Sequence, residues 1–264
     1  MHGAGLLRLI HPSAIVDPAA ELDEGVEVGP FSIIGAGVRI AAGTRIGPHV
    51  VVRGPSDIGR DNRFFQFASI GEDPQDKKYA GEPTRLIMGD RNVVREGATI
   101  HRGTVQDAVE TRIGHDNLFM AYAHVAHDCW IGDHVILANA ASLGGHVRVE
   151  DWAILGGFTL VHQFCHVGAH SFCAMGSVVA RDVPTYVTAG GHPAVPRGVN
   201  SEGLKRRGFS DLAIAAIRRA YRLLYMSGLP LADALTAIRE QAGGHPELVP
   251  LAEFVANSTR SIVR

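Results

Sequence analysis

A large apolar residue recurs at every sixth position through most of this sequence. Every sixth residue from Ile10 to Ile70 is apolar, the phase resumes at Met88, and after a shift of one residue it runs from Ile113 to Val179. Runs of this length are not expected by chance, even though 46% of the residues are hydrophobic. The residue two positions before each of these apolar residues is mostly small, and the residue directly after the apolar one is often glycine. This six-residue period constrains the fold more than any other feature of the chain.

Six-residue units of this kind form short strands joined by tight corners. The apolar side chain points into a narrow core, the small residue shares that core, and glycine is expected to relieve the corner. Three units close one coil, and successive coils stack at the interstrand spacing of about 4.8 Å. The aromatic content of 6% fits a thin prism without room for rings. A β-sandwich would alternate with period two, so we expect an all-β solenoid of parallel strands.

Two segments, residues 71–86 and 103–112, interrupt the repeat. Long excursions from a rigid scaffold commonly carry function, although the second is also compatible with a tolerated insertion. After Pro184 a Pro- and Gly-rich linker leads to helices predicted to begin near Ser210, Pro230 and Pro246. We therefore expect a β-helix over residues 1–190, and a linker and helical domain over 191–264 that caps its open end.

Charge and composition exclude several classes of protein. The formal net charge of -2 gives no basic field for nucleic acid. Three cysteines are too few for a disulfide scaffold, and an odd number cannot all pair within the chain. No apolar run reaches the ~18 residues of a membrane span, and the start, where Arg8 interrupts a short apolar run, lacks the order of a signal peptide. We expect a cytoplasmic protein without stable membrane insertion.

Half of the 14 histidines lie between residues 124 and 170, and none of these seven occupies an inward apolar position. Residues eighteen apart stack on neighbouring coils, which predicts one polar column on the outside of the solenoid. Its members are His127, Gly145, His146, His162 and Gln163.

His127 is followed directly by Asp128. A neutral imidazole is a good general base near neutral pH, and an adjacent carboxylate can fix its tautomer. Gly145, one coil further along, could donate its N–H to a developing oxyanion. The cysteines, Cys129, Cys165 and Cys173, fall at inward positions and are expected in the core, so direct base catalysis fits better than a covalent intermediate.

Two other interpretations of the histidines stay open at this level. The first is that the histidines form a solvent-exposed column without a function. The second is a zinc site of the kind that a carbonic anhydrase family builds on hexapeptide coils, for which His162, His166 and His170 are the candidates. Their equal spacing of four has no special meaning in a coil of six-residue units.

Several segments together resemble the UDP-N-acetylglucosamine acyltransferases that begin lipid A synthesis. They are QFASIGEDPQDKKYAGEPTRL, IHRGTV, HVAHDC, GGHV, VHQF and VNSEGLKRRGFS. The resemblance implies a left-handed parallel β-helix that forms a homotrimer with active sites between subunits. It implies transfer of a 3-hydroxyacyl chain from acyl-carrier protein to the 3-OH of UDP-N-acetylglucosamine. No metal or other cofactor is then needed, because acyl-carrier protein supplies the thioester as co-substrate.

The same resemblance implies roles for individual residues. His127 matches the catalytic base, Asp128 its orienting carboxylate and Gly145 the oxyanion donor. Met175 stands where the family measures acyl length, and its bulk implies a shorter chain than glycine would allow. Glu72–Pro74 have no counterpart role. The residues matched to substrate contacts are Asp76, Lys78, His124, His146, His162, Gln163, Asn200, Glu202, Arg206 and Arg207.

Related enzymes give the competing expectations. A later N-acyltransferase of the same pathway, which acts on a sugar-nucleotide amine, carries an extra N-terminal domain, whereas here the repeat begins by residue 10. A serine acetyltransferase would carry helices before the solenoid. A structural or ice-binding solenoid would show columns of threonine rather than a His/Gln column beside a charged loop.

Overall fold

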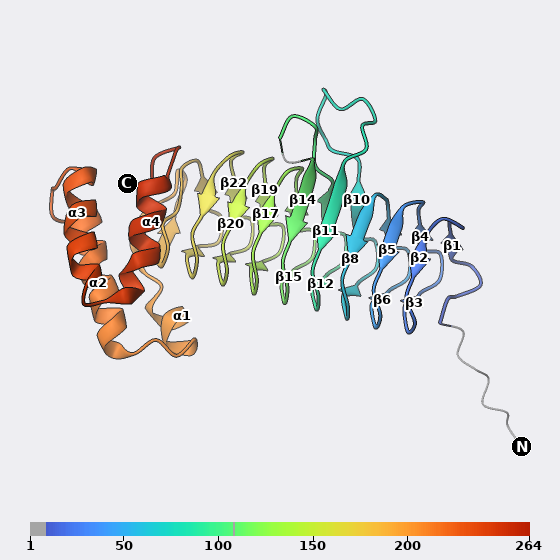
Figure 1. The fold of residues 1–264 in the computed structure, drawn as a ribbon, viewed down its shortest axis with the longest axis horizontal. Coiled ribbons are helices and arrows are strands. Elements are labelled where there is room, and N and C mark those ends of the chain that lie inside the picture. The colour runs from blue at the N-terminus through green and yellow to red at the C-terminus, as the bar shows by residue number, and fades with distance from the viewer. Residues whose placement is uncertain (1–8, 108) are drawn as a thin grey trace, which may run out of the picture. The chain divides into compact units, whose positions relative to one another are not determined.

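The computed structural model describes residues 9–107 and 109–264, and the first eight residues of the predicted β-helix lie outside this range. The chain divides into two compact units, Met1–Cys129 and Trp130–Arg264. Both units contain coils of short parallel strands, drawn as stacked arrows in Figure 1. The fold is a left-handed parallel β-helix with helices at its C-terminal end, as the repeat and the resemblance predicted.

In the first unit, three parallel sheets form the faces of the coils. One sheet contains β1 (Ile15–Val16), β4 (Ile33–Ile34), β7 (Val51–Val52), β10 (Ser69–Glu72), β13 (Thr99–His101) and β16 (His124–Val125). A second contains β2 (Glu21–Leu22), β5 (Val38–Ile40), β8 (Ser56–Ile58), β11 (Arg85–Met88) and β14 (Glu110–Ile113). The third contains β3 (Glu27–Val28), β6 (Arg45–Ile46), β9 (Arg63–Phe64), β12 (Val93–Val94) and β15 (Leu118–Phe119).

The second unit repeats the pattern with shorter sheets. One sheet contains β19 (Ser142–Leu143), β22 (Leu160–Val161) and β25 (Val178–Val179). A second contains β17 (Trp130–Ile131), β20 (Arg148–Val149) and β23 (His166–Val167). The third contains β18 (Ile136–Leu137), β21 (Ile154–Leu155), β24 (Phe172–Cys173), β26 (Val187–Gly190) and β27 (Val195–Val199). β27 is antiparallel to β26. The predicted linker, VTAGGHPAVPRGVN at 187–200, is therefore largely a pair of strands.

The pairing register confirms the eighteen-residue coil. Ile15 pairs with Ile33, eighteen positions on. Among the described residues, the register widens at the two predicted excursions, where Ser69 pairs with Thr99 and Thr99 pairs with His124. Figure 1 shows the two loops, 73–84 and 102–109, leaving the coils on the same side. Residue 108 of the second loop lies outside the described residues.

The core contains the predicted apolar and small residues, but two sequence-based explanations were wrong. Rings do enter the prism, because Phe64 and Phe119 are buried at inward positions. Glycine after the apolar residue serves close packing of coils rather than the corner itself: a Cβ on Gly29 would lie 2.7 Å from the backbone of the next coil. The left-handed corners are often non-glycine, as at Phe31, whose φ is 60°.

The helices lie beyond the last coil of the second unit (Figure 1). They are α1 (Ser201–Arg206), α2 (Asp211–Tyr225), α3 (Leu231–Ala242), a 3₁₀ turn η1 (Pro246–Leu248) and α4 (Val249–Asn257). Ser210 caps α2 by accepting a hydrogen bond from the N–H of Ala213, as predicted. The helix predicted from Pro246 begins as the 3₁₀ turn instead.

The helical core continues onto the end of the solenoid, which confirms the predicted cap. Buried Tyr186 belongs to the same apolar cluster as the helices, and its hydroxyl donates to the carbonyl of Glu247 at 2.9 Å. Buried Asp182 accepts hydrogen bonds from the N–H of His166 and from the hydroxyl of Ser258. The helices thereby cover apolar surface that the last coil would otherwise expose. Within the described residues, none of the helices combines the length and apolarity that a membrane span requires.

Candidate active site

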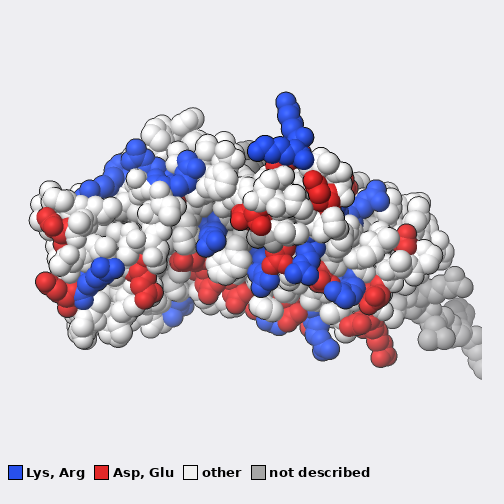
Figure 2. Space-filling model, turned by 45° about the horizontal axis from the view of Figure 1, so that its top comes forward, with Lys and Arg blue, Asp and Glu red and all other residues white. Residues whose placement is uncertain are grey.

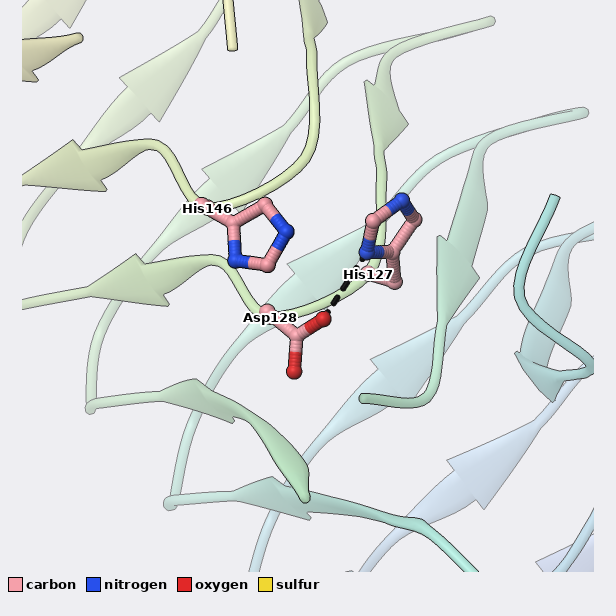
Figure 3. Close-up of side chains that lie close together, drawn as sticks. All are labelled: His127, Asp128 and His146. Atoms are coloured by element: carbon pink, nitrogen blue, oxygen red, sulfur yellow. Dashed lines mark hydrogen bonds and ion pairs between the residues drawn. The ribbon is translucent and has the colours of Figure 1, made fainter. Parts of the chain in front are cut away.

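The predicted His–Asp pair is formed. His127 and Asp128 follow β16, and the Nδ1 of His127 lies 2.8 Å from an Asp128 carboxylate oxygen (Figure 3). The Asp128 side chain is fully buried, whereas 14% of the His127 side chain is exposed. Since a carboxylate accepts hydrogen bonds, Nδ1 carries the proton and Nε2, which points away from Asp128, presents its lone pair. The pair has the geometry of a general base with an orienting carboxylate.

Asp128 is held by two threonines that sequence reasoning missed. Thr104 donates from its N–H to one carboxylate oxygen at 2.9 Å and from its hydroxyl to the other at 2.6 Å. The hydroxyl of Thr111 accepts a hydrogen bond from the N–H of Asp128 at 2.9 Å. The φ angle of Asp128 is 58°, in the left-handed region. Thr111 lies two residues before Ile113, at a position that the repeat predicts to be small and inward. That pattern could have indicated this contact. Thr104 lies in the second excursion, which the pattern of the repeat does not describe.

A second cluster of histidines lies beside the pair. The Oγ1 of Thr99 is 2.7 Å from Nδ1 of His124, and the rings of His124 and His101 meet edge to face at 5.4 Å. Burial, reinforced by His101 and His127, lowers the pKa of His124 to about 4. His124 is therefore neutral at pH 7 and can offer a hydrogen bond without adding charge.

Glu72–Pro74, which had no expected role, anchor the first loop. The carbonyl of Asp73 accepts from Nδ1 of His101 at 2.6 Å, and its carboxylate pairs with Arg102. The buried guanidinium of Arg102 also donates to the carbonyls of Gly54 and Gly71. Pro74 is buried at the base of the loop. The cluster of His101 and Arg102 therefore fixes the point where the loop leaves the coils.

Asp76 and Lys78 lie further out on this loop. The Asp76 carboxylate accepts from the N–H of Lys78 at 3.0 Å, so it shapes the turn, while the Lys78 side chain is exposed. In the first unit the structure thus gathers His124, His127 and Asp128, and it presents Lys78 to solvent. On the face shown in Figure 2, acidic and basic residues are interspersed without a large field of one sign.

The second unit presents the remaining members of the predicted column. Gly145 is buried, its carbonyl accepts from the N–H of Phe164, and its own N–H donates no hydrogen bond to the described residues. The ring of His146 stacks on Phe164 with centroids 4.4 Å apart. His162 and Gln163 are exposed, and Nδ1 of His162 lies 3.1 Å from the Gln163 carbonyl.

Two family models match the chain. One, described as "Udp N-acetylglucosamine O-acyltransferase; Domain 2", matches residues 182–263. The other, "Bacterial transferase hexapeptide (six repeats)", matches residues 19–54 and 110–145.

Full-length relatives decide the family. The chain is 56% identical over 258 residues to an acyl-[acyl-carrier-protein]--UDP-N-acetylglucosamine O-acyltransferase of Stutzerimonas stutzeri, covering 98% of this chain and 100% of the relative. A relative with the same name from Herminiimonas arsenicoxydans is 57% identical, with the same coverage. The chain belongs to this acyltransferase family.

Solved structures agree with that assignment. The LpxA structure from Acinetobacter baumannii superposes with a TM-score of 0.95 at 46% identity, over 97% of this chain and 100% of that one. The UDP-N-acetylglucosamine acyltransferase of Campylobacter jejuni, at 31% identity, gives a TM-score of 0.79 over 97% and 99% of the two chains.

The segment after the solenoid of this acyltransferase has structural as well as candidate binding residues. The Asn200 side chain accepts from the N–H of Gly203, which caps α1, and donates to the carbonyl of His170 at 2.9 Å. Glu202 and Arg206 are exposed. Asn200 is therefore needed for the local fold whatever else it binds.

Arg207 is partly buried and packs against two rings. It donates to Nδ1 of His170 at 3.3 Å, and its guanidinium carbon lies 5.2 Å from the centre of the Trp152 ring. Burial lowers the pKa of the Arg207 guanidinium. Burial and the charge of Arg207 lower the pKa of His170 to about 4, so this histidine is neutral at pH 7. Substitution of Arg207 would therefore disturb packing as well as any anion contact.

Met175 is 80% exposed on the outer surface of the second unit. It follows β24 at a corner where the coils approach closely, because a Cβ on Gly156 would lie 2.7 Å from the Met175 nitrogen. Its backbone is therefore firmly placed while its side chain is free to contact a ligand.

The three histidines of the zinc interpretation do not converge. Among the described residues, His162, His166 and His170 do not form a group with ligand atoms within 4.8 Å of one another. His166 pairs with Glu150 at 2.9 Å, and His170 contacts Arg207. Their spacing of four places them on different sides of a coil built from six-residue units.

The three cysteines are buried, as predicted. Burial raises the pKa of Cys165 to about 11 and of Cys173 to about 12, which makes both poor nucleophiles at neutral pH.

Proposed function

We propose that this chain transfers a 3-hydroxyacyl chain from acyl-carrier protein to the 3-OH of UDP-N-acetylglucosamine, the first step of lipid A biosynthesis, with His127 as general base. Membership of the family carries the reaction class and the substrates. The single structural observation that carries the mechanism is the contact of 2.8 Å between Nδ1 of His127 and the buried carboxylate of Asp128.

The proposed steps follow from this geometry. The Nε2 of His127 takes the proton of the sugar 3-OH as its oxygen attacks the thioester carbonyl carbon, and Asp128 stabilises the resulting imidazolium. The N–H of Gly145 donates to the negatively charged oxygen of the tetrahedral intermediate. Collapse of the intermediate breaks the carbon–sulfur bond, and the imidazolium returns its proton to the departing carrier thiolate. Atoms and charges balance without an additional reactant.

Substrate binding is proposed residue by residue from the family match. Lys78 and Arg207 supply positive charge for the pyrophosphate. The uncharged His124 offers its ring to the sugar, which is consistent with its lowered pKa. The other proposed contacts are Asp76, His146, His162, Gln163, Asn200, Glu202 and Arg206.

We further propose a cytoplasmic homotrimer in which the acyl chain lies between subunits and ends at Met175. The exposed Met175 side chain supports this, because a ruler must be accessible to the acyl chain. Methionine is longer than glycine by about four heavy atoms, so an acyl chain of about ten to twelve carbons is expected rather than fourteen.

The decisive experiment compares His127→Ala with His49→Ala. His49 is a matched corner histidine of the same unit, stacked between Phe31 and Phe67, with no proposed role. Loss of the base should lower kcat by at least about 10²-fold without lowering the melting temperature. The His49 variant should retain activity. Near-normal kcat in His127→Ala would overturn the mechanism.

Two accompanying measurements separate this proposal from its alternatives. The proposed mechanism uses no metal, so activity should survive dialysis against a chelator; loss on dialysis with recovery on added zinc would favour the zinc enzyme. Mass spectrometry of products from UDP-N-acetylglucosamine and its 3-amino analogue distinguishes the 3-hydroxyl from the amine as acceptor. Preferential acylation of the amine would reassign the substrate.

A further inference from the structure

The second excursion brings Thr104 against Asp128. Thr104 lies three residues after the end of β13 and is 1% exposed, although its neighbour Val105 is 45% exposed. Its N–H and its hydroxyl donate to different oxygens of the Asp128 carboxylate, at 2.9 and 2.6 Å. One residue thus holds both oxygens of a carboxylate whose side chain is fully buried.

Two donors on one carboxylate restrict its rotation. The oxygen that accepts from the Thr104 hydroxyl also accepts from Nδ1 of His127. If the carboxylate turned, that oxygen would leave the imidazole, and the ring would lose its fixed tautomer. Hydrogen bonds to a buried carboxylate also favour its ionised form, which a partner of an imidazolium needs.

We infer that Thr104 is a positioning residue for the acyl transfer, holding the Asp128 carboxylate so that His127 presents Nε2 as a base. The inference rests on the proposed function and adds a residue that does not touch substrate. It also gives the second excursion a role, since Thr104 lies near the start of that excursion and reaches Asp128.

The test uses Thr104→Val, which keeps the shape and removes the hydroxyl donor, and Thr104→Ser, which keeps the donor. Loss of a hydrogen bond to a charged group should lower kcat by about tenfold to a hundredfold. The KM for UDP-N-acetylglucosamine should stay within about twofold, because Thr104 acts after binding. Serine should restore kcat to within about threefold of wild type.

Two controls distinguish positioning from a structural role. Thr44→Val removes another buried hydroxyl, which donates to the carbonyl of Gly59 at 3.0 Å; it should lower the melting temperature without lowering kcat. In an Asp128→Asn background, Thr104→Val should lower kcat by less than about twofold, because the carboxylate that Thr104 positions has already been replaced.

The outcomes separate this inference from the proposed function. Wild-type kcat in Thr104→Val, no rescue by serine, or an undiminished loss in the Asp128→Asn background would each overturn the role of Thr104. Retained turnover in His127→Ala would instead overturn the proposed function. If the valine variant does not fold, Thr104→Ala is judged by the same kinetic criteria against serine.

Discussion

The guanidinium of Arg102 donates a hydrogen bond to the hydroxyl of Tyr79 at 3.0 Å. Arg102 follows strand β13, whereas Tyr79 lies on the loop over 73–84. The Tyr79 hydroxyl in turn donates to the carbonyl of Glu82 at 3.0 Å. A buried cation of the coil thus reaches the middle of the loop that carries Asp76 and Lys78.

Arg102→Lys should loosen this loop while leaving the His127–Asp128 pair in place. A lysine ammonium cannot reproduce the forked donation that joins Gly54, Gly71 and Tyr79. We expect KM for the sugar-nucleotide to rise about fivefold or more and amide exchange over 73–84 to accelerate. Arg85→Lys is the matched control, because Arg85 stands at the same loop but is half exposed. Equal effects of the two substitutions would contradict the special role of Arg102.

Lys78→Ala should weaken use of UDP-N-acetylglucosamine, whereas Lys77→Ala should not. Both side chains are exposed on one loop, so their general electrostatic effects match. Loss of a direct phosphate contact should raise KM by about tenfold with a smaller change in kcat. Initial rates over a range of nucleotide concentrations provide the measurement. Indistinguishable variants would mean that Lys78 makes no specific contact.

Met175→Gly should move the acyl preference toward longer chains. A buried methylene contributes about 0.8 kcal/mol, so opening the end of the groove should favour acyl chains longer by about two to four carbons. Competition between carrier-bound chains, read by mass spectrometry, gives the preference directly. Met226→Ala removes another highly exposed methionine, directly after α2, and should not change the preference. An unchanged preference in Met175→Gly would show that another residue closes the groove.

Stability should decline as the pH falls from about 6.5 to about 4. Burial holds the folded-state pKa of His124 and of His170 at about 4, below the ordinary value of 6.5. The unfolded chain therefore binds more protons in this window, and the stabilisation present above pH 6.5 is lost as pH falls. Melting temperatures across this range should fall less steeply for His170→Gln than for wild type. The exposed His192→Gln should match wild type, and a wild-type slope in His170→Gln would contradict the assignment.

The sequence alone determined the coil, because a rigid six-residue period leaves few other ways to bury Ile34, Ile70 or Leu137. The sequence also predicted the helical cap, the inward cysteines and the interaction between the side chains of His127 and Asp128. These features depend on periodicity or on residues that are neighbours in the chain. Chemistry and the coil spacing suggested the roles of His127, Asp128 and Gly145, whereas the substrate-binding roles and that of Met175 came from the resemblance; all of these roles stay predictions.

Only the tertiary structure decided what surrounds the His–Asp pair. Thr104, Arg102 and Asp73 lie in or beside the two excursions, where no period relates sequence distance to spatial distance. Their contacts join residues 23 to 48 positions apart, so no local pattern could indicate them. The same reason explains the glycines and the rings: whether Gly29 must lack a side chain, or Phe119 fits inside, depends on how closely neighbouring coils approach.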